Sequence, residues 1–185
     1  MEQNVEKMLT ENRDAVTRAA VRDTARLYGK NVSADDLCRI YGEKTLELGV
    51  GADLPTAGGV IASFHSPAFN GVRHSHDFFE MSFVTSGEVV DETGGEKITL
   101  EAGDAIIHTP RSNHKICACT DPEGLINVVL SREMLTDSFY SSLLRDKNLE
   151  TAFYCRAPQT SGAFPVRGIG ESTRAVVNLL LGELA

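Results

Sequence analysis

Seven short segments with strand-like composition follow one another between residues 60 and 130, and turn-forming residues separate them. They span residues 60–64, 78–85, 88–91, 97–100, 105–109, 115–119 and 125–130. The intervening turns contain Ser86-Gly87, Thr93-Gly94-Gly95, Ala102-Gly103-Asp104 and Asp121-Pro122. Short strands with turns at such close spacing are typical of a β-sandwich or β-barrel. The central region is therefore predicted to be mainly β.

Three histidines and one glutamate stand out within this region. His74, His76 and Glu80 lie in one short run, and His114 follows a Gly-Asp turn. Side chains along a strand alternate between its faces, so positions 74, 76 and 80 share one face if the run is extended. Imidazole and carboxylate groups are common ligands of divalent transition metals. This face is the predicted site of metal or ligand binding.

Three further residues are candidates for the edge of that site. His108 either orients a ligand histidine or ends its strand facing solvent or the pocket mouth. Arg73 and Arg111 flank the cluster in sequence. They either contact an anionic effector through bidentate hydrogen bonds or remain solvated at the surface.

The flanks of the strand region have a different pattern. Residues 1–50 are predicted to form a helical N-terminal arm, with one helix ending near Gly29 and a second capped by Ser33, with Asp36 at its third helical position. This arm is expected to pack on the core or on a partner subunit. Residues 51–135 would form the β-barrel, and 151–167 have the composition of a loop.

The C-terminal segment, 136–185, is predicted to be helical, and its strongest helix, 171–184, is apolar nearly all round. We expect this helix to continue into a further domain. The strand at 78–85 is also apolar on both faces, with Phe79, Met81 and Phe83 opposite the face that carries Glu80. Such a strand needs a cover on its outer side, which would be the second sheet, the N-terminal helices or a partner subunit. Together these features predict a homodimer.

Composition narrows the functional classes. The chain has 185 residues, with 18 basic and 26 acidic side chains, a net charge of −8 and no basic block that would favour nucleic-acid binding. No apolar run approaches the ~20 residues of a membrane span, and the N-terminus lacks the features of a signal peptide. We therefore expect a cytoplasmic protein without membrane contact, in which Cys38, Cys117, Cys119 and Cys155 are free thiols.

The spacing of these residues resembles the first motif of the cupin superfamily, whose members form a jelly-roll-type antiparallel β-barrel. That motif contains a glycine, a His-x-His pair, a glutamate and a closing glycine. Here they correspond to Gly71, His74, His76, Glu80 and Gly87. The opening glycine is closer to the first histidine than the motif requires. The resemblance implies a cupin barrel with N-terminal and C-terminal α-helices.

The second cupin motif is partly retained. Gly103 and His114 are in place, but Thr109 and Arg111 replace the proline and glycine of its turn, and Ala118 replaces a later asparagine. The resemblance implies a metal-ligand set of His74, His76, Glu80 and His114, with Zn, Ni, Fe or Mn as the candidate divalent metals. Regulator-type cupins also use these positions to line a pocket without metal.

The amino-acid sequence of residues 74–114 is similar to that of the N-terminal effector domain of AraC-type transcription regulators. That resemblance implies a domain that binds a small-molecule effector and dimerises, with DNA contacts made by a C-terminal domain outside this chain. A non-enzymatic function is favoured on this basis. The alternatives are a stand-alone metal-dependent cupin enzyme, such as a dioxygenase or isomerase, and a non-catalytic binding or storage cupin.

Overall fold

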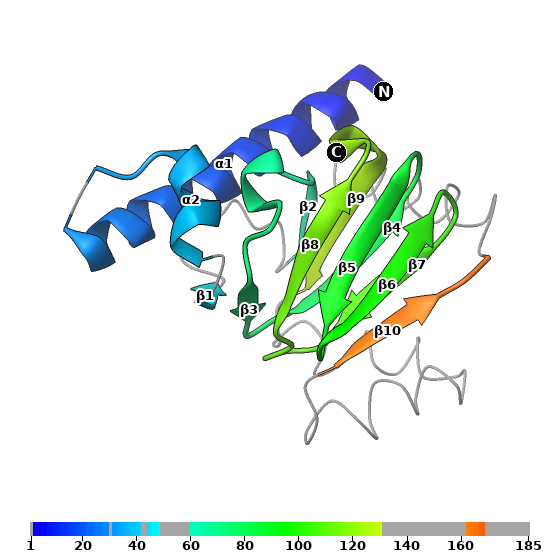
Figure 1. Cartoon of the computed structure of the whole chain (residues 1–185). Helices are drawn as coiled ribbons and strands as arrows, with labels where there is room; N and C mark the ends of the chain where they lie inside the picture. The colour runs from blue at the N-terminus through cyan, green and yellow to red at the C-terminus, as the bar shows by residue number, and fades with distance from the viewer. Residues whose placement is uncertain (1, 30, 42–43, 49–59, 131–161, 169–185) are drawn as a thin grey trace, which may run out of the picture.

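The computed structural model describes residues 2–29, 31–41, 44–48, 60–130 and 162–168. Two five-stranded sheets stack into a sandwich, with one helix running along the outer side of the second sheet and another helix at one end (Figure 1). The prediction of a mainly β fold with an N-terminal helical region is confirmed.

Each sheet combines strands that are distant in sequence. The first sheet has the order β1 (Leu46–Leu48), β3 (His74–His76), β8 (His114–Cys119), β5 (Glu88–Thr93) and β6 (Glu96–Glu101). The second has the order β10 (Ala163–Val166), β7 (Ala105–His108), β4 (Phe79–Val84), β9 (Leu125–Leu130) and β2 (Val60–Phe64). All the described pairs are antiparallel except β1 with β3.

All seven predicted strands are present, and β2 and β9 have the predicted bounds. The turns between them use glycine where the backbone needs a positive φ. Gly87, at φ +75°, allows the chain to enter β5, and a Cβ there would lie 2.7 Å from the Thr120 side chain. Local turn chemistry therefore places the strand ends.

The expectation that residues 74–80 form one extended run is wrong. The backbone bends at Asp77 and Phe78, which separates β3 from β4. β3 belongs to the first sheet and β4 to the second. His74 and His76 therefore face Glu80 across the sandwich instead of sharing a strand face with it.

Two strands lie where none was predicted. β1, within the predicted helical arm, pairs with β3, and β10, within the predicted loop, pairs with β7. Both are short and lie at sheet edges. β10 contains Pro165, which a sheet tolerates at an edge because proline has no N–H to donate. Short edge strands of this kind carry little periodicity for sequence analysis to detect.

The helices match their predicted signals. α1 (Glu2–Tyr28) ends before Gly29, whose φ of +63° and N–H bond to the Ala25 carbonyl at 2.9 Å terminate the helix. α2 (Ala34–Tyr41) follows Ser33, whose backbone N–H and hydroxyl donate to Asp36 Oδ2 at 3.0 and 2.8 Å. The predicted contribution of Asp36 to the cap is confirmed, since its carboxylate accepts from the Ser33 backbone N–H.

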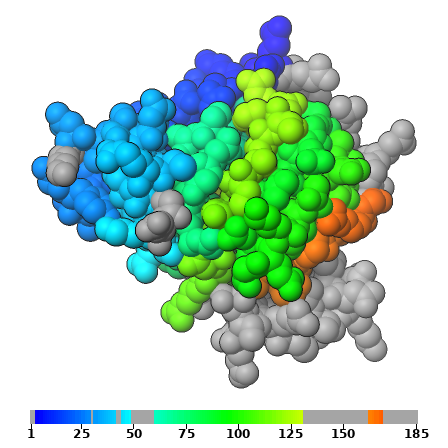
Figure 2. Space-filling view, in the orientation of Figure 1, coloured from blue at the N-terminus to red at the C-terminus, as the bar shows by residue number. Residues whose placement is uncertain are grey.

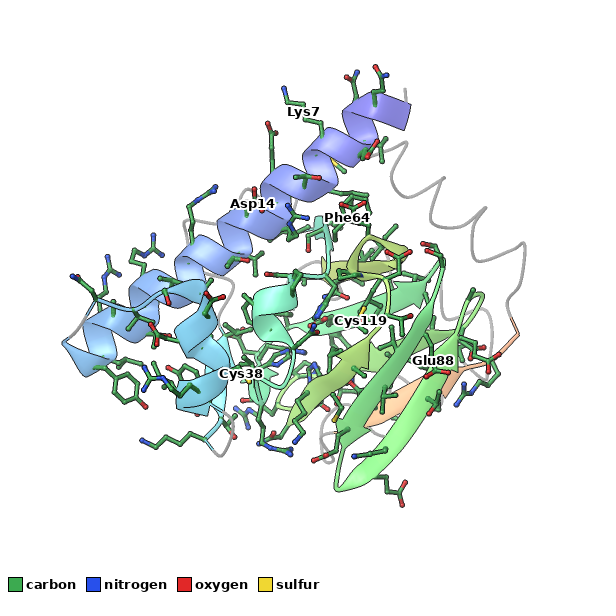
Figure 3. The ribbon with its side chains drawn as sticks, turned by 45° about the horizontal axis from the view of Figure 1, so that its top comes forward. Lys7, Asp14, Cys38, Phe64, Glu88 and Cys119 are labelled. Carbon is green, nitrogen blue, oxygen red and sulfur yellow. The ribbon has the colours of Figure 1, made fainter. Side chains whose placement is uncertain are left out.

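The expectation that the arm packs on the core is confirmed for α1, which runs alongside β2 (Figure 1). Leu9 joins an apolar cluster on the outer face of the second sheet, with Phe64 among its members. Figure 3 shows Phe64 on the side of α1 that faces the strands, and Lys7 pointing away from them. The Asn12 side chain donates to the Ala62 carbonyl at 2.8 Å, which ties the helix to β2.

The second half of α1 and all of α2 pack beside β1 and β3, and Figure 2 shows these helices as one end of the molecular surface. Ala20, Leu37, Tyr41 and Leu46 are buried together there. Thr17 donates its hydroxyl hydrogen to Ser66 Oγ at 2.9 Å. The arm is thus part of the folded domain along most of its length.

The space between the sheets divides into an apolar part and a polar part. The apolar part contains Val84, Val89, Leu100, Ile106, Ile116 and Leu125, which come from both sheets. The polar part contains the histidine and glutamate side chains singled out above. Because burial of a charged group is costly without partners, the polar part is the natural place to seek function.

Several predictions concern other parts of the chain. The predicted helix 171–184 and Cys155 lie outside the described residues. Cys38, Cys117 and Cys119 are free cysteines. Among the described residues, no helix combines the length and the apolar character that crossing a membrane would require.

Candidate metal centre

Four side chains converge from three strands and both sheets. β3 supplies His74 and His76, the start of β8 supplies His114, and β4 supplies Glu80 from the opposite sheet. His74 and His114 are direct partners in the β3–β8 pair. All four side chains are buried. The structure therefore brings together the four residues expected to bind a metal.

The three histidines share one hydrogen-bonding arrangement. His74 Nδ1 lies 3.1 Å from the Val72 carbonyl, His76 Nδ1 lies 2.8 Å from the Phe78 carbonyl, and His114 Nδ1 lies 3.4 Å from the Ser112 carbonyl. A carbonyl oxygen only accepts, so each Nδ1 is assigned the proton. In the neutral rings, Nε2 then carries the lone pair. Backbone-anchored imidazoles with a free Nε2 are typical of metal ligands.

Glu80 faces this group of lone pairs. Its Oε2 lies 3.3 Å from His76 Nε2, and Ser82 Oγ donates to its Oε1 at 3.4 Å. His76 Nε2 is buried and has no hydrogen-bond partner among the described groups. A carboxylate oxygen and an imidazole lone pair at this distance repel each other unless a proton or a cation lies between them. A divalent ion fits this arrangement.

Burial sets the charge states of the cluster. Desolvation lowers the pKa of His74 to about 4 and that of His114 well below its usual range, because a charged ring is costly in the interior. Desolvation alone would raise the pKa of Glu80, but a proton on His76 Nε2, which would hydrogen-bond to the carboxylate, outweighs it and lowers the pKa to about 2. At neutral pH, His74 and His114 are thus neutral and Glu80 is ionised, which are the forms that bind a metal.

The geometry supports a compact ligand set. Ligand atoms of His74, Glu80 and His114 all lie within 4.8 Å of one another. His76 adds the nitrogen that faces Glu80. Imidazole nitrogens with one carboxylate suit Zn, Ni, Fe or Mn, and a metal bound there would act as a Lewis acid towards a ligand oxygen.

A cavity of about 120 Å³ adjoins the cluster and extends to α1. His74, Glu80 and His114 line its polar end, and Val16 and Ala20 of α1 contribute to its other wall. A cavity of about 150 Å³ accommodates benzene, so this space suits a ligand of roughly six heavy atoms. A molecule in the cavity would touch the metal ligands and the N-terminal helix together.

Two residues of the cavity were not expected from the sequence. His65 is buried and its Nε2 donates to Asn70 Oδ1 at 2.8 Å, while desolvation lowers its pKa. Asn127 Oδ1 is buried and has no hydrogen-bond partner among the residues that the structure describes. Alternation along β2 places Ile61, Ser63 and His65 on one face, and all three line the cavity. Extending the period-2 pattern by one residue would have identified His65.

His108 is also central, and of the two expected positions it does not take the solvent-facing strand end. It ends β7 but is fully buried, opposite Glu80 in the β4–β7 pair. Its ring stacks on that of His114, with the centroids 3.7 Å apart and the planes inclined by 11°. His108 thus contacts a candidate ligand directly.

Arg73 and Arg111, the two arginines expected at the edge of the site, do not line this cavity. Arg73 forms an ion pair with Glu92, which Lys115 also contacts at 3.4 Å. Arg111 is exposed, with its backbone N–H donating to the His76 carbonyl at 2.6 Å. Their predicted role in effector binding has no support from this geometry.

Comparisons with known proteins agree with the fold. Residues 65–129 match the family model described as a cupin domain, and the chain therefore carries a cupin domain. None of the curated proteins matches the chain significantly.

The similar solved structures are distant. A cupin protein from Bacteroides fragilis is 28% identical over 43% of this chain and 70% of its own, with a TM-score of 0.35. A cupin 2 conserved barrel protein from Salinispora arenicola is 23% identical over 48% of this chain and 76% of its own, with a TM-score of 0.36. ToxT from Vibrio cholerae, an AraC-type regulator, is 11% identical over 68% of this chain and 47% of its own, with a TM-score of 0.44.

Proposed function

We propose that this chain is the effector-sensing and dimerisation domain of an AraC-type transcription regulator, which binds a small molecule beside a divalent metal in the cupin barrel. The observation that carries the ligand-binding part is the cavity between the histidine cluster and α1. The sequence similarity of residues 74–114 to AraC-type effector domains supports the regulatory part.

The cavity suggests how binding would be relayed. Leu46 and Leu48 of β1 line it together with Val16 and Ala20 of α1. A ligand that contacts this wall would favour the docked arrangement of the arm over others, and such differential contact is what shifts a conformational equilibrium. The homodimer and a DNA-binding C-terminal domain belong to the same proposal.

Metal binding is tested by thermal unfolding with Zn²⁺, Ni²⁺, Fe²⁺ or Mn²⁺, the iron titrated without oxygen. At a metal concentration 100 times the dissociation constant, the expected stabilisation is about 2.7 kcal/mol. His114→Ala should abolish it. Lys115→Ala is the matched control, since Lys115 follows on the same strand and contacts Glu92. An equal loss in both variants, or no metal effect in the wild type, would contradict a metal at this cluster.

The regulatory assignment is tested by reading the native open reading frame beyond Ala185. We expect roughly one further domain's length with two helix-turn-helix patterns and a basic balance. A stop codon within a few residues would refute a DNA-binding regulator. Light scattering at micromolar concentration tests the dimer, and a monomer mass would count against it.

A metal-dependent cupin enzyme, a dioxygenase or isomerase, is the second candidate. The adjacency of the cavity to the histidine nitrogens supports it, because a metal held there would be open to a substrate. Liquid chromatography with mass spectrometry of small carboxylic acids incubated with the metal-loaded protein and oxygen separates the two functions, because chromatography also resolves an isomer of unchanged mass. Recovery of a bound acid unchanged favours a sensor, and its turnover favours an enzyme.

A further inference from the structure

A second group of ligating side chains lies behind His114, away from the cavity described above. Asp91 comes from β5 and His108 from β7, and both are fully buried. The β5–β8 pairing has an irregularity between Val90 and Asp91. Bulges of this kind re-aim a side chain, and here Asp91 is buried within the sandwich.

The hydrogen bonding of this pair is incomplete. Thr93 Oγ1 donates to Asp91 Oδ1 at 2.6 Å. Asp91 Oδ2 lies 3.3 Å from His108 Nε2, but the two do not form a hydrogen bond of acceptable geometry. Among the described groups, neither ring nitrogen of His108 has a hydrogen-bond partner. Buried polar atoms are rarely left in this state, so the pair calls for an explanation.

His114 joins this pair to form a triad. Ligand atoms of Asp91, His108 and His114 all lie within 4.8 Å of one another. At metal–ligand lengths of about 2.0–2.2 Å, adjacent ligands of one ion are roughly 3–3.6 Å apart. The 3.3 Å between Asp91 Oδ2 and His108 Nε2 falls in that range. Two imidazoles and a carboxylate also form a common donor set for zinc-like ions.

We propose that Asp91, His108 and His114 form a second position for a divalent transition metal, which shares His114 with the position that His74, His76 and Glu80 complete. A neutral imidazole has one lone pair because its other nitrogen carries the proton. His114 therefore serves one ion at a time, and the barrel holds one equivalent that has two alternative positions. This inference rests on the proposed metal-binding function of the same barrel.

The experiment measures Zn²⁺ stoichiometry by calorimetry and elemental analysis. The wild type is expected to bind one equivalent. The variant His74→Ala/Glu80→Gln lacks two of the three residues private to the first position, leaving only His76 there, and should still bind one equivalent, more weakly. Adding Asp91→Asn to that variant should reduce binding below a tenth of an equivalent. A cooperative thermal transition in each variant establishes that it is folded.

Each other result contradicts a defined part of the reasoning. No zinc in the wild type overturns both the proposed metal function and this inference. Zinc in the wild type but not in the folded double variant overturns this inference alone. If the variant that also carries Asp91→Asn still binds zinc, Asp91 and His108 form only a buried pair and no metal position. Binding of two equivalents by the wild type would refute the sharing of His114.

If the double variant does not fold, Glu80→Gln alone gives the answer. Imidazole ¹⁵N spectra are recorded during a zinc titration of that variant. A zinc-dependent shift at the His108 nitrogens supports the second position. Shifts confined to His74, His76 and His114 overturn it.

Discussion

Substitution of Leu9 by alanine tests whether α1 is an integral part of this domain. Leu9 is 2% exposed and packs with Val60 and Phe64 on the outer face of the second sheet. Leucine-to-alanine changes at such sites cost about 2–5 kcal/mol, through lost burial and the cavity left behind. We expect a loss of about 3 kcal/mol, because leucine and alanine differ little in helix propensity.

Leu27 provides a matched control on the same helix. It is 76% exposed, so Leu27→Ala should change the stability by no more than about 0.5 kcal/mol. The assay is urea denaturation followed by circular dichroism, with an unchanged denaturant slope required for the comparison. In thermal unfolding, the Leu9 variant should melt roughly 6–12 °C lower.

Equal effects of the two substitutions would refute the reasoning. A loss below about 1 kcal/mol for Leu9→Ala would likewise mean that α1 is not held by this contact. The cavity wall formed by Val16 and Ala20 would then lack a stable support, and the relay from ligand to arm would lose its basis.

The other predictions concern turns and an acidic contact. Gly87→Ala should destabilise the protein more than Gly94→Ala, and a comparison of their denaturation midpoints tests this. Both glycines have a positive φ, but only a Cβ at Gly87 would meet a neighbour, the Thr120 side chain at 2.7 Å. Arg111→Gly should stabilise the fold by up to about 1 kcal/mol, since a φ of +67° strains a residue with a side chain, and a lower melting temperature would contradict this. Burial opposes ionisation of Asp104, but backbone N–H donors outweigh this effect and lower the pKa of the carboxyl group. The contribution of Asp104 to stability is therefore present above about pH 4 and is lost as the pH falls further. The difference between the wild type and Asp104→Asn should therefore shrink between pH 7 and pH 3 in urea titrations.

The strands were predictable because their signals are local. Alternation and turn residues delimit β2 and β9, whose observed bounds equal the predicted ones. The cap formed by Ser33 and Asp36 likewise needs only neighbouring residues. β1 and β10 escaped prediction because short edge strands take their structure from the strand beside them.

The four candidate ligands of the first metal position were predictable in identity but not in arrangement. His74, His76, Glu80 and His114 do converge, although the reasoning that placed the first three on one strand face was wrong. Because side chains alternate between the faces of a strand, Arg73 is expected on the face opposite to that of His74. In the structure Arg73 contacts Glu92 instead of the cavity.

Asp91 shows why part of the site was missed. Its burial beside His108 depends on the stacking of two sheets and on an irregularity in the β5–β8 register. The cavity wall from α1 depends in the same way on a helix far away in sequence. These contacts join residues that are far apart in the sequence, so no local sequence pattern predicts them.

The sequence by itself determined the strand and turn pattern, the caps of the helices and the kinds of ligating side chain available, because each follows from residues close together in the chain. Tertiary structure alone decided that Glu80 faces the histidines from the opposite sheet, that His114 lies between two ligand sets and that α1 closes the cavity. These features arise from long-range packing. Burial there also keeps His74 neutral, whereas the contact with His76 keeps Glu80 ionised against the effect of burial, and no sequence pattern specifies either state.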